Sequence, residues 1–225
     1  MLSVSTALER LRDCLSDDFP LSSGTRIFDI PFPLHDAFDP LLWCGHQAQW
    51  PQFYWLQRNG DEELAALGAV KTFPSLAGAH DFLQRQGLAD LRICGLNAFN
   101  PQEGRLFLPR LEWRRVGGKA TLRLLLNSET SLREDAIAAR AFLQALTPDQ
   151  AQPAALPPVL SEQHSPDYPQ WHALIEQATQ AIAAGEMDKV VLARATDVQF
   201  AAPPDPLAIV AASLRSNHRC FHFMM

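Results

Sequence analysis

Hydrophobic residues recur with the period of a helix over residues 171–182, and this period changes abruptly after Gly185. The apolar positions follow the spacing of one face of an α-helix; they are Trp171, Leu174, Ile175, Ala178 and Ile182. Pro169 suits the first turn of such a helix, and Gly185 suits its C-terminal end. The pattern therefore predicts one amphipathic helix that stops at Gly185.

The next apolar stretch, Val190–Ala193, is continuous and rich in β-branched residues. Such a run is typical of a strand that is covered on both faces. Because side chains alternate along a strand, Lys189 would share a face with Val191, Ala193 and Ala195, where the two small alanines leave room for a ligand. Arg194 would point to the other face, where we expect a structural ion pair, since a buried cation without a partner is costly.

Lys189 has two interpretations. Most lysines are exposed, and a lysine at the start of a strand can protect its edge against unwanted pairing. The pattern alone favours this interpretation. Alternatively, Lys189 is a general base, which requires burial or a nearby cation to lower its pKa from the usual value of about 10.4.

Two hairpins are predicted earlier in the chain. An aromatic strand over Gln52–Arg58 is followed by Asn59-Gly60, a strong hairpin turn signal, and by a return strand over Leu64–Val70. The second hairpin joins Arg105–Val116 to Lys119–Leu126 through Gly117-Gly118. Hairpins of this kind build antiparallel sheet.

Capping signals predict helices between these strands. Thr6 and Ser131 each open a capping box, and Ser75 is expected to cap a helix that ends at Gly87. A further helix is predicted over 38–49, and strands over 25–30 and 91–96; prolines at 31 and 33 should end the first strand. The fold class is therefore α+β: antiparallel sheets with helices packed outside.

Prolines concentrate between residues 147 and 169, where little apolar periodicity remains. Such a segment is typical of an extended connection. We divide the chain into an N-terminal α+β part (1–150), a Pro-rich connection (151–167) and a C-terminal part (168–225).

Composition narrows the class of protein further. The chain has 225 residues, of which 47% are hydrophobic and 20% charged, as in a globular protein. A net charge of −6 gives no basic footprint for nucleic acid, no apolar run approaches a membrane span, and charges from Glu9 onward break any signal-peptide core. We therefore expect a cytoplasmic protein with neither nucleic-acid nor membrane partners.

Candidate metal ligands are poorly spaced. The cysteines Cys14, Cys44, Cys94 and Cys220 show neither metal-site nor disulfide spacing. His218, Cys220 and His222 would share one face of a last strand, but about 3.3 Å per residue puts the two histidines roughly 13 Å apart. One zinc ion cannot bind both of them, so we predict no metal site among these residues.

The stretch Glu186–Arg194 resembles the motif that opens the chorismate-binding module of isochorismate synthases. Phe53–Val70 and Ile30–Phe38 resemble the amino-terminal part of the menaquinone-type members of this family of chorismate-utilising enzymes. The resemblance implies the family's fold, with residues 168–225 as the start of the chorismate-binding module. It also implies an isomerase that converts chorismate to isochorismate for menaquinone biosynthesis, in which Lys189 activates the attacking water.

The resemblance further implies that the family's module continues for about as many residues again. That part carries the general-acid glutamate, the glutamates that hold Mg²⁺ and the groups that bind the substrate carboxylates. Because this chain stops within the apolar run Cys220–Met225, we expect a truncated enzyme. Of the principal catalytic residues it would carry Lys189 alone, with Mg²⁺ as cofactor bound outside it, and it would be inactive by itself.

Two alternatives stay open. One is another chorismate-utilising enzyme, either a salicylate synthase or an amine-transferring relative. Lys189 argues against the amine users, and the aromatic hairpin argues mildly against salicylate formation. The other alternative is a non-catalytic fragment.

Overall fold

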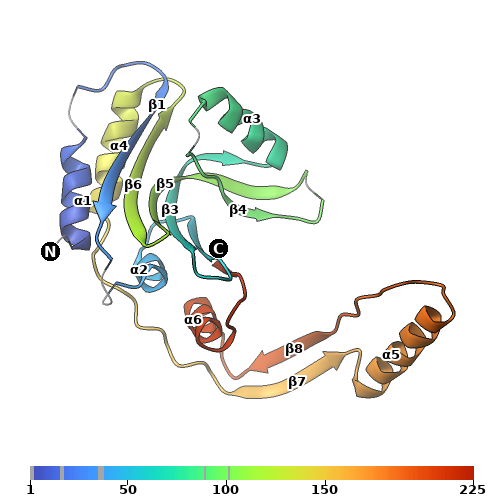
Figure 1. The fold of residues 1–225 in the computed structure, drawn as a ribbon. Coiled ribbons are helices and arrows are strands. Elements are labelled where there is room, and N and C mark those ends of the chain that lie inside the picture. The colour runs from blue at the N-terminus through green and yellow to red at the C-terminus, as the bar shows by residue number, and fades with distance from the viewer. Residues whose placement is uncertain (1–2, 16–17, 35–37, 89, 101) are drawn as a thin grey trace. The chain divides into compact units, whose positions relative to one another are not determined.

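Residues 3–15, 18–34, 38–88, 90–100 and 102–225 are described by a computed structural model (Figure 1). The chain forms two compact units: a large unit of residues 1–153 and 206–225, and a small unit of residues 154–205. These boundaries differ from the division at 150 and 167, because the last twenty residues (206–225) pack with the large unit. The predicted division into functional parts stays a prediction.

The large unit is built on a seven-stranded sheet with the order β1-β6-β5-β3-β2-β9, in which β4 pairs with β5. Its strands are β1 (Gly24–Phe32), β2 (Gln52–Leu56), β3 (Glu62–Phe73), β4 (Cys94–Asn97), β5 (Gly104–Val116), β6 (Lys119–Ser128) and β9 (His222–Met224). Every pairing in this sheet is antiparallel. The α+β prediction and both predicted hairpins, β2–β3 and β5–β6, are confirmed.

Local chemistry explains the β5–β6 hairpin. Gly117 and Gly118 have φ values of 52° and 79°, which residues with a side chain rarely adopt, and Val116 pairs with Lys119 across the turn. The prediction for β1 was too short, since this strand continues through Pro31 to Phe32. Because β1 is an edge strand, one of its sides needs no partner, and proline is tolerated there.

The described helices of the large unit number five, and the first four begin at a side-chain cap. They are α1 (Val4–Asp13), α2 (Pro40–His46), α3 (Leu76–Gln86), α4 (Leu132–Gln144) and α6 (Pro206–Ser216). Ser75 caps α3 as predicted. Ser131 caps α4 by accepting a hydrogen bond from the amide of Glu134, which is one of the two bonds of the predicted capping box. The capping box at Thr6 was wrong: Ser3 is the cap of α1, and its hydroxyl accepts a hydrogen bond from the amide of Thr6. Helix α6 was not predicted, and α2 is shorter than the helix predicted over 38–49.

Neighbouring residues of β6 enter different hydrophobic cores, two of the three that the described residues form. Leu124 and Leu126 of β6 enter the main core with residues of α1, α2, α4 and α6, whereas Leu125 enters a smaller core with Phe82 of α3. Figure 1 shows α3 well apart from α1 and α4. Alternation along one strand thus supplies both cores.

The small unit contains β7 (Val159–Ser165), α5 (Tyr168–Ala183) and β8 (Ala195–Phe200), with β7 and β8 paired antiparallel. The predicted strand at 190–193 was wrong, since β8 starts at Ala195. Ser165, the last residue of β7, pairs with Ala195, and Pro166 then removes a backbone donor before α5 begins. Within the small unit, the residues before Ala195 therefore have no strand to pair with.

Candidate functional site

The segment that carries Lys189 leaves α5 through a defined C-terminal turn. Gly185 has a φ of 74°, its amide bonds to the carbonyl of Ile182, and the amide of Glu186 bonds to the carbonyl of Ala181. This pair of bonds is a Schellman motif, which glycine favours because it has no side chain. At the other end, Asp167 and Gln170 form a capping box. The predicted helix and its stop at Gly185 are thus confirmed.

Residues 186–194 run as irregular chain between α5 and β8. Lys189 is exposed, and none of the hydrogen bonds or ion pairs among the described residues involves its amine. Val191, expected in a covered strand, is 79% exposed. In this chain the amine is accessible, and no described carboxyl contacts it.

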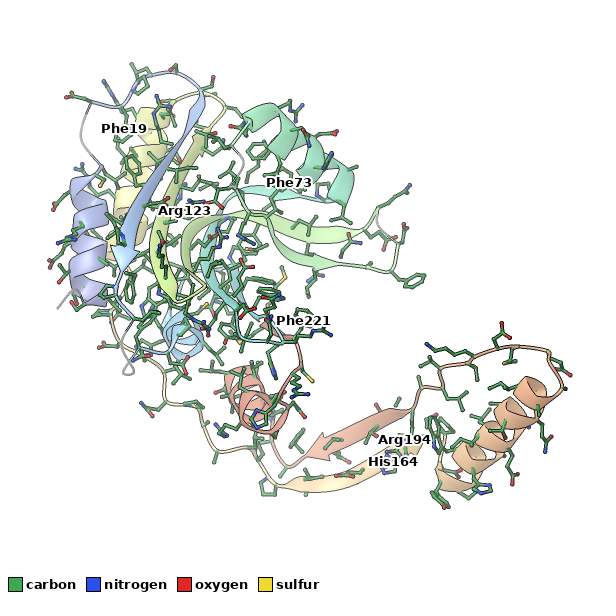
Figure 2. The ribbon with its side chains drawn as sticks, in the orientation of Figure 1. Phe19, Phe73, Arg123, His164, Arg194 and Phe221 are labelled. Carbon is green, nitrogen blue, oxygen red and sulfur yellow. The ribbon has the colours of Figure 1, made fainter. Side chains whose placement is uncertain are left out.

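Arg194 lies just before β8, close to the end of β7 that carries His164 (Figure 2). The ion pair expected for Arg194 is not among those formed by the described residues. His164 instead contacts the hydroxyl of Thr196 at 2.9 Å across the β7–β8 ladder. Arg194 is exposed, so hydration removes the need for a partner.

The histidines and cysteine near the end of the chain do not gather. The expected shared strand face was wrong, because β9 begins at His222, after His218 and Cys220. His222 is buried, and its ring contacts the Ser213 hydroxyl at 3.3 Å and the Asn217 carbonyl at 3.0 Å. Its role is to join α6 to β9. Nowhere in the described chain do three or more His, Cys, Asp or Glu side chains form a group that could hold a metal ion.

Sequence reasoning missed a polar cluster on the sheet of the large unit. Glu112 and Arg114 alternate along β5, and Thr121 and Arg123 alternate along the adjacent β6. Polar or charged residues at every second position of two paired strands were the available signal. These four residues and Asp29 of β1 line a cleft of ≈ 270 Å³.

Comparison with known proteins identifies the family. The sequence profile of the family described as chorismate binding enzyme matches residues 96–225, a range that includes Lys189 and both hairpin strands β5 and β6. This chain belongs to the chorismate-binding enzymes. The resemblance found in the motif around Lys189 is therefore confirmed.

Individual relatives agree with this assignment. The chain is 56% identical over 226 aligned residues to the isochorismate synthase MenF of Escherichia coli K12, covering 100% of this chain and 52% of that protein. It is 30% identical over 189 residues to the MenF of Pasteurella multocida, covering 84% of this chain and 43% of that protein. It spans about half the length of the curated relatives that it matches.

A solved structure matches in the same way. The menaquinone-specific isochorismate synthase MenF from E. coli superposes with a TM-score of 0.84 at 55% identity, over 98% of this chain and 52% of that chain. The antiparallel sheet with its helices is thus shared with the matching half of the E. coli enzyme. Within the described part of this chain, no helix is both long and apolar enough to cross a membrane.

Proposed function

We propose that this protein acts as part of an isochorismate synthase that serves menaquinone biosynthesis. The observation that carries the proposal is the 56% identity along the whole chain to the E. coli enzyme. The reaction converts chorismate to isochorismate: water adds at ring carbon 2, the hydroxyl at ring carbon 4 departs, and the ring double bonds rearrange. Chorismate is thus the expected substrate, in the reducing cytoplasm where free cysteines such as Cys14 and Cys220 persist.

In this proposal Lys189 takes the proton from the attacking water. The neutral amine of Lys189 accepts the proton on Nζ, and the resulting hydroxide forms the new bond to carbon. Support comes from the family match across this residue and from the Schellman turn that directs the segment away from α5. A lysine is a useful base at neutral pH only when its pKa is lowered. The exposed amine must therefore become covered in the active enzyme.

We infer that this cover comes from the part of the relatives' length that the chain does not span. The apolar side chains of α5 stay exposed within the small unit, as do Val190 and Val191. Exposed apolar area next to a lysine is what a covering segment would bury.

Mg²⁺ is the expected cofactor, but the residues described here do not fit it. A Mg²⁺ site uses carboxylate oxygens brought together in near-octahedral geometry, and the described residues bring no such group together. No step in the proposal for this chain depends on the metal. Ligands outside this chain remain a prediction.

The test is a hybrid enzyme in which the remaining half of the E. coli relative is fused to this chain. We expect Mg²⁺-dependent isochorismate formation from the hybrid. Lys189→Ala should lower kcat by about 10²–10⁴-fold, the usual contribution of a positioned general base. Lys189→Gln keeps the length of the side chain and should be nearly as inactive. Lys71→Gln, which changes a half-exposed lysine of the large unit, is the matched control.

Two results would contradict the proposal. A near-normal kcat for Lys189→Gln would show that Lys189 is not the base and is only an exposed residue that precedes a strand. An active hybrid that makes salicylate or an amino product would favour another chorismate-utilising enzyme.

The 225-residue chain alone should show no turnover, because a base without its acid and substrate contacts lacks most of the transition-state stabilisation. Turnover by the rigorously purified chain would show that it carries its own acid. A hybrid that folds but never turns over would favour the non-catalytic alternative.

A further inference from the structure

Glu112 occupies an unusual position on the sheet of the large unit. It is 4% exposed, and its direct neighbours across β5 are Arg123 of β6 and Ala66 of β3. No hydrogen bond from a described residue reaches its carboxyl group. Because burying a carboxylate without hydrogen bonds is costly, the site favours the protonated form of Glu112 unless another group supplies a partner.

Three arginines surround Glu112, but other acids already hold them. Arg123 makes bonds of 2.7 and 2.8 Å to the carboxylate of Asp29 and of 2.8 Å to that of Asp90. Arg114 bonds to Asp90 at 2.8 Å and to Glu62 at 3.2 Å.

Arg92, from the segment before β4, pairs with Glu62 at 2.7 Å. Burial raises the pKa of Glu112 to about 7, and the nearby arginines limit the rise.

The register of the sheet places all these side chains on one face. Glu112 pairs with Arg123, Arg114 with Thr121, and Val116 with Lys119, so the six side chains form three rows along the β5–β6 hairpin. They line a cleft of ≈ 270 Å³ together with Asp29 and Asp90. This volume is below that of a typical drug-sized pocket, so only a small molecule fits.

The cleft is lined by equal numbers of acidic and basic side chains, but two of these side chains form no ion pair with a described residue. Asp29, Asp90 and Glu112 oppose Arg114, Lys119 and Arg123. After the ion pairs are formed, the carboxyl of Glu112 remains at the buried end. The ammonium of Lys119 remains exposed at the hairpin end, without a bond to a described residue. Their rows are four residues apart along the strand, which is about 13 Å between Cα atoms. A lysine side chain that leans along the strand shortens the distance between the two charged groups.

We propose that this cleft binds a small zwitterion, an amino acid whose ammonium group contacts Glu112 and whose carboxylate contacts Lys119. The Thr121 hydroxyl, which lies between the two rows, is available to either end of the ligand. An ion of one sign would satisfy one end of the cleft and leave the other without a partner. The site lies on β1, β5 and β6 of the large unit and uses none of the residues assigned to the isochorismate synthase reaction.

The test titrates the 225-residue chain with γ-aminobutyrate at pH 8 and follows backbone amide shifts of residues 110–124 by NMR. The matched half-ligands are butylamine, which lacks the carboxylate, and butyrate, which lacks the ammonium group. We expect saturable millimolar binding of γ-aminobutyrate, and at least tenfold weaker binding of either half-ligand. Binding should weaken as the pH falls below about 7, because a protonated Glu112 loses its charge.

Glu112→Gln should abolish the binding, and Lys119→Ala, a surface change, should weaken it several-fold. Circular dichroism verifies that both variants are folded. The proposal is overturned by an absence of saturable binding to the wild-type chain, by unchanged binding to Glu112→Gln, or by a half-ligand that binds as well as γ-aminobutyrate.

Discussion

Helices α4 and α5 have the same apolar periodicity, but only the apolar face of α4 is buried. In α4 the buried residues Leu132, Ala136, Ala139 and Leu143 face the sheet and α1. In α5 the corresponding stripe stays unburied, and no residue of the small unit, 154–205, is buried at all. A hydrophobic stripe thus shows which face of a helix is apolar. Whether that face is covered depends on a partner that the stripe does not specify.

The polar residues show the same contrast between the two units. In the large unit, Arg110 is buried and donates two bonds, of 2.7 and 2.6 Å, to Asp135 at the start of α4. In the small unit, Lys189 and Arg194 are exposed to solvent. The large unit therefore has internal contacts to lose on mutation, and the small unit has few.

The largest effect on stability is expected for Asp135→Ala. This change removes both bonds to Arg110 and the bond that the amide of Asn127 donates at 2.9 Å. It leaves a buried guanidinium without its partner, which typically costs about 3–5 kcal/mol. Urea denaturation followed by circular dichroism should show this loss. Asp188→Ala, which removes an exposed carboxylate of the small unit, should be nearly silent, and equal losses for both variants would contradict the comparison.

Replacing an apolar side chain with alanine should cost much more stability in the large unit than in the small unit. Leu124 is 0% exposed in the main core and Ile175 of α5 is 41% exposed. Leu124→Ala should lower the free energy of unfolding by about 2–5 kcal/mol, whereas Ile175→Ala should stay within about 0.5 kcal/mol. A large cost for Ile175→Ala in the 225-residue chain would mean that α5 is covered after all.

A smaller and pH-dependent effect is expected at Glu112. Burial raises the pKa of this carboxyl from 4.5 to about 7, so the folded state holds its proton more tightly than the unfolded state does. The resulting stability is fully present below about pH 4.5 and is lost as the pH rises to about 7. Glu112→Gln mimics the protonated form. It should therefore stabilise the chain by about 2–3 kcal/mol at pH 8 and by almost nothing at pH 4.

Thermal or urea denaturation of wild type and Glu112→Gln at both pH values provides the measurement. Glu103→Gln, on an exposed loop residue, is the control. A stability difference that does not change with pH would show that Glu112 does not titrate in this range.

Turn and cap signals predicted the fold well because they act over a few residues. Gly117-Gly118, Ser75, Ser131 and Gly185 each satisfy a local backbone requirement, and each was recognised correctly. The strand expected at 190–193 failed for the opposite reason. An apolar run becomes a strand only when another strand hydrogen-bonds to it, and within this unit β7 ends at Ser165.

The motif around Lys189 identified the family, because the order of residues in a motif is itself sequence information. The cluster around Glu112 was missed, because it joins residues of β1, β5, β6 and the segment near Asp90 that lie far apart in the chain.

The amino-acid sequence by itself determined much of the local structure of this protein, namely its hairpin turns, the caps of α3 and α4, and the apolar face and the end of α5. It also determined its membership of the chorismate-binding enzymes. Tertiary structure alone decided which apolar faces are covered, which arginine holds which acid, and that Glu112 is left without a hydrogen bond among the described residues. The physical reason is the distance along the chain over which each interaction acts. Backbone conformation responds to neighbours a few residues away, whereas burial and ion pairing depend on strands that sheet register brings together.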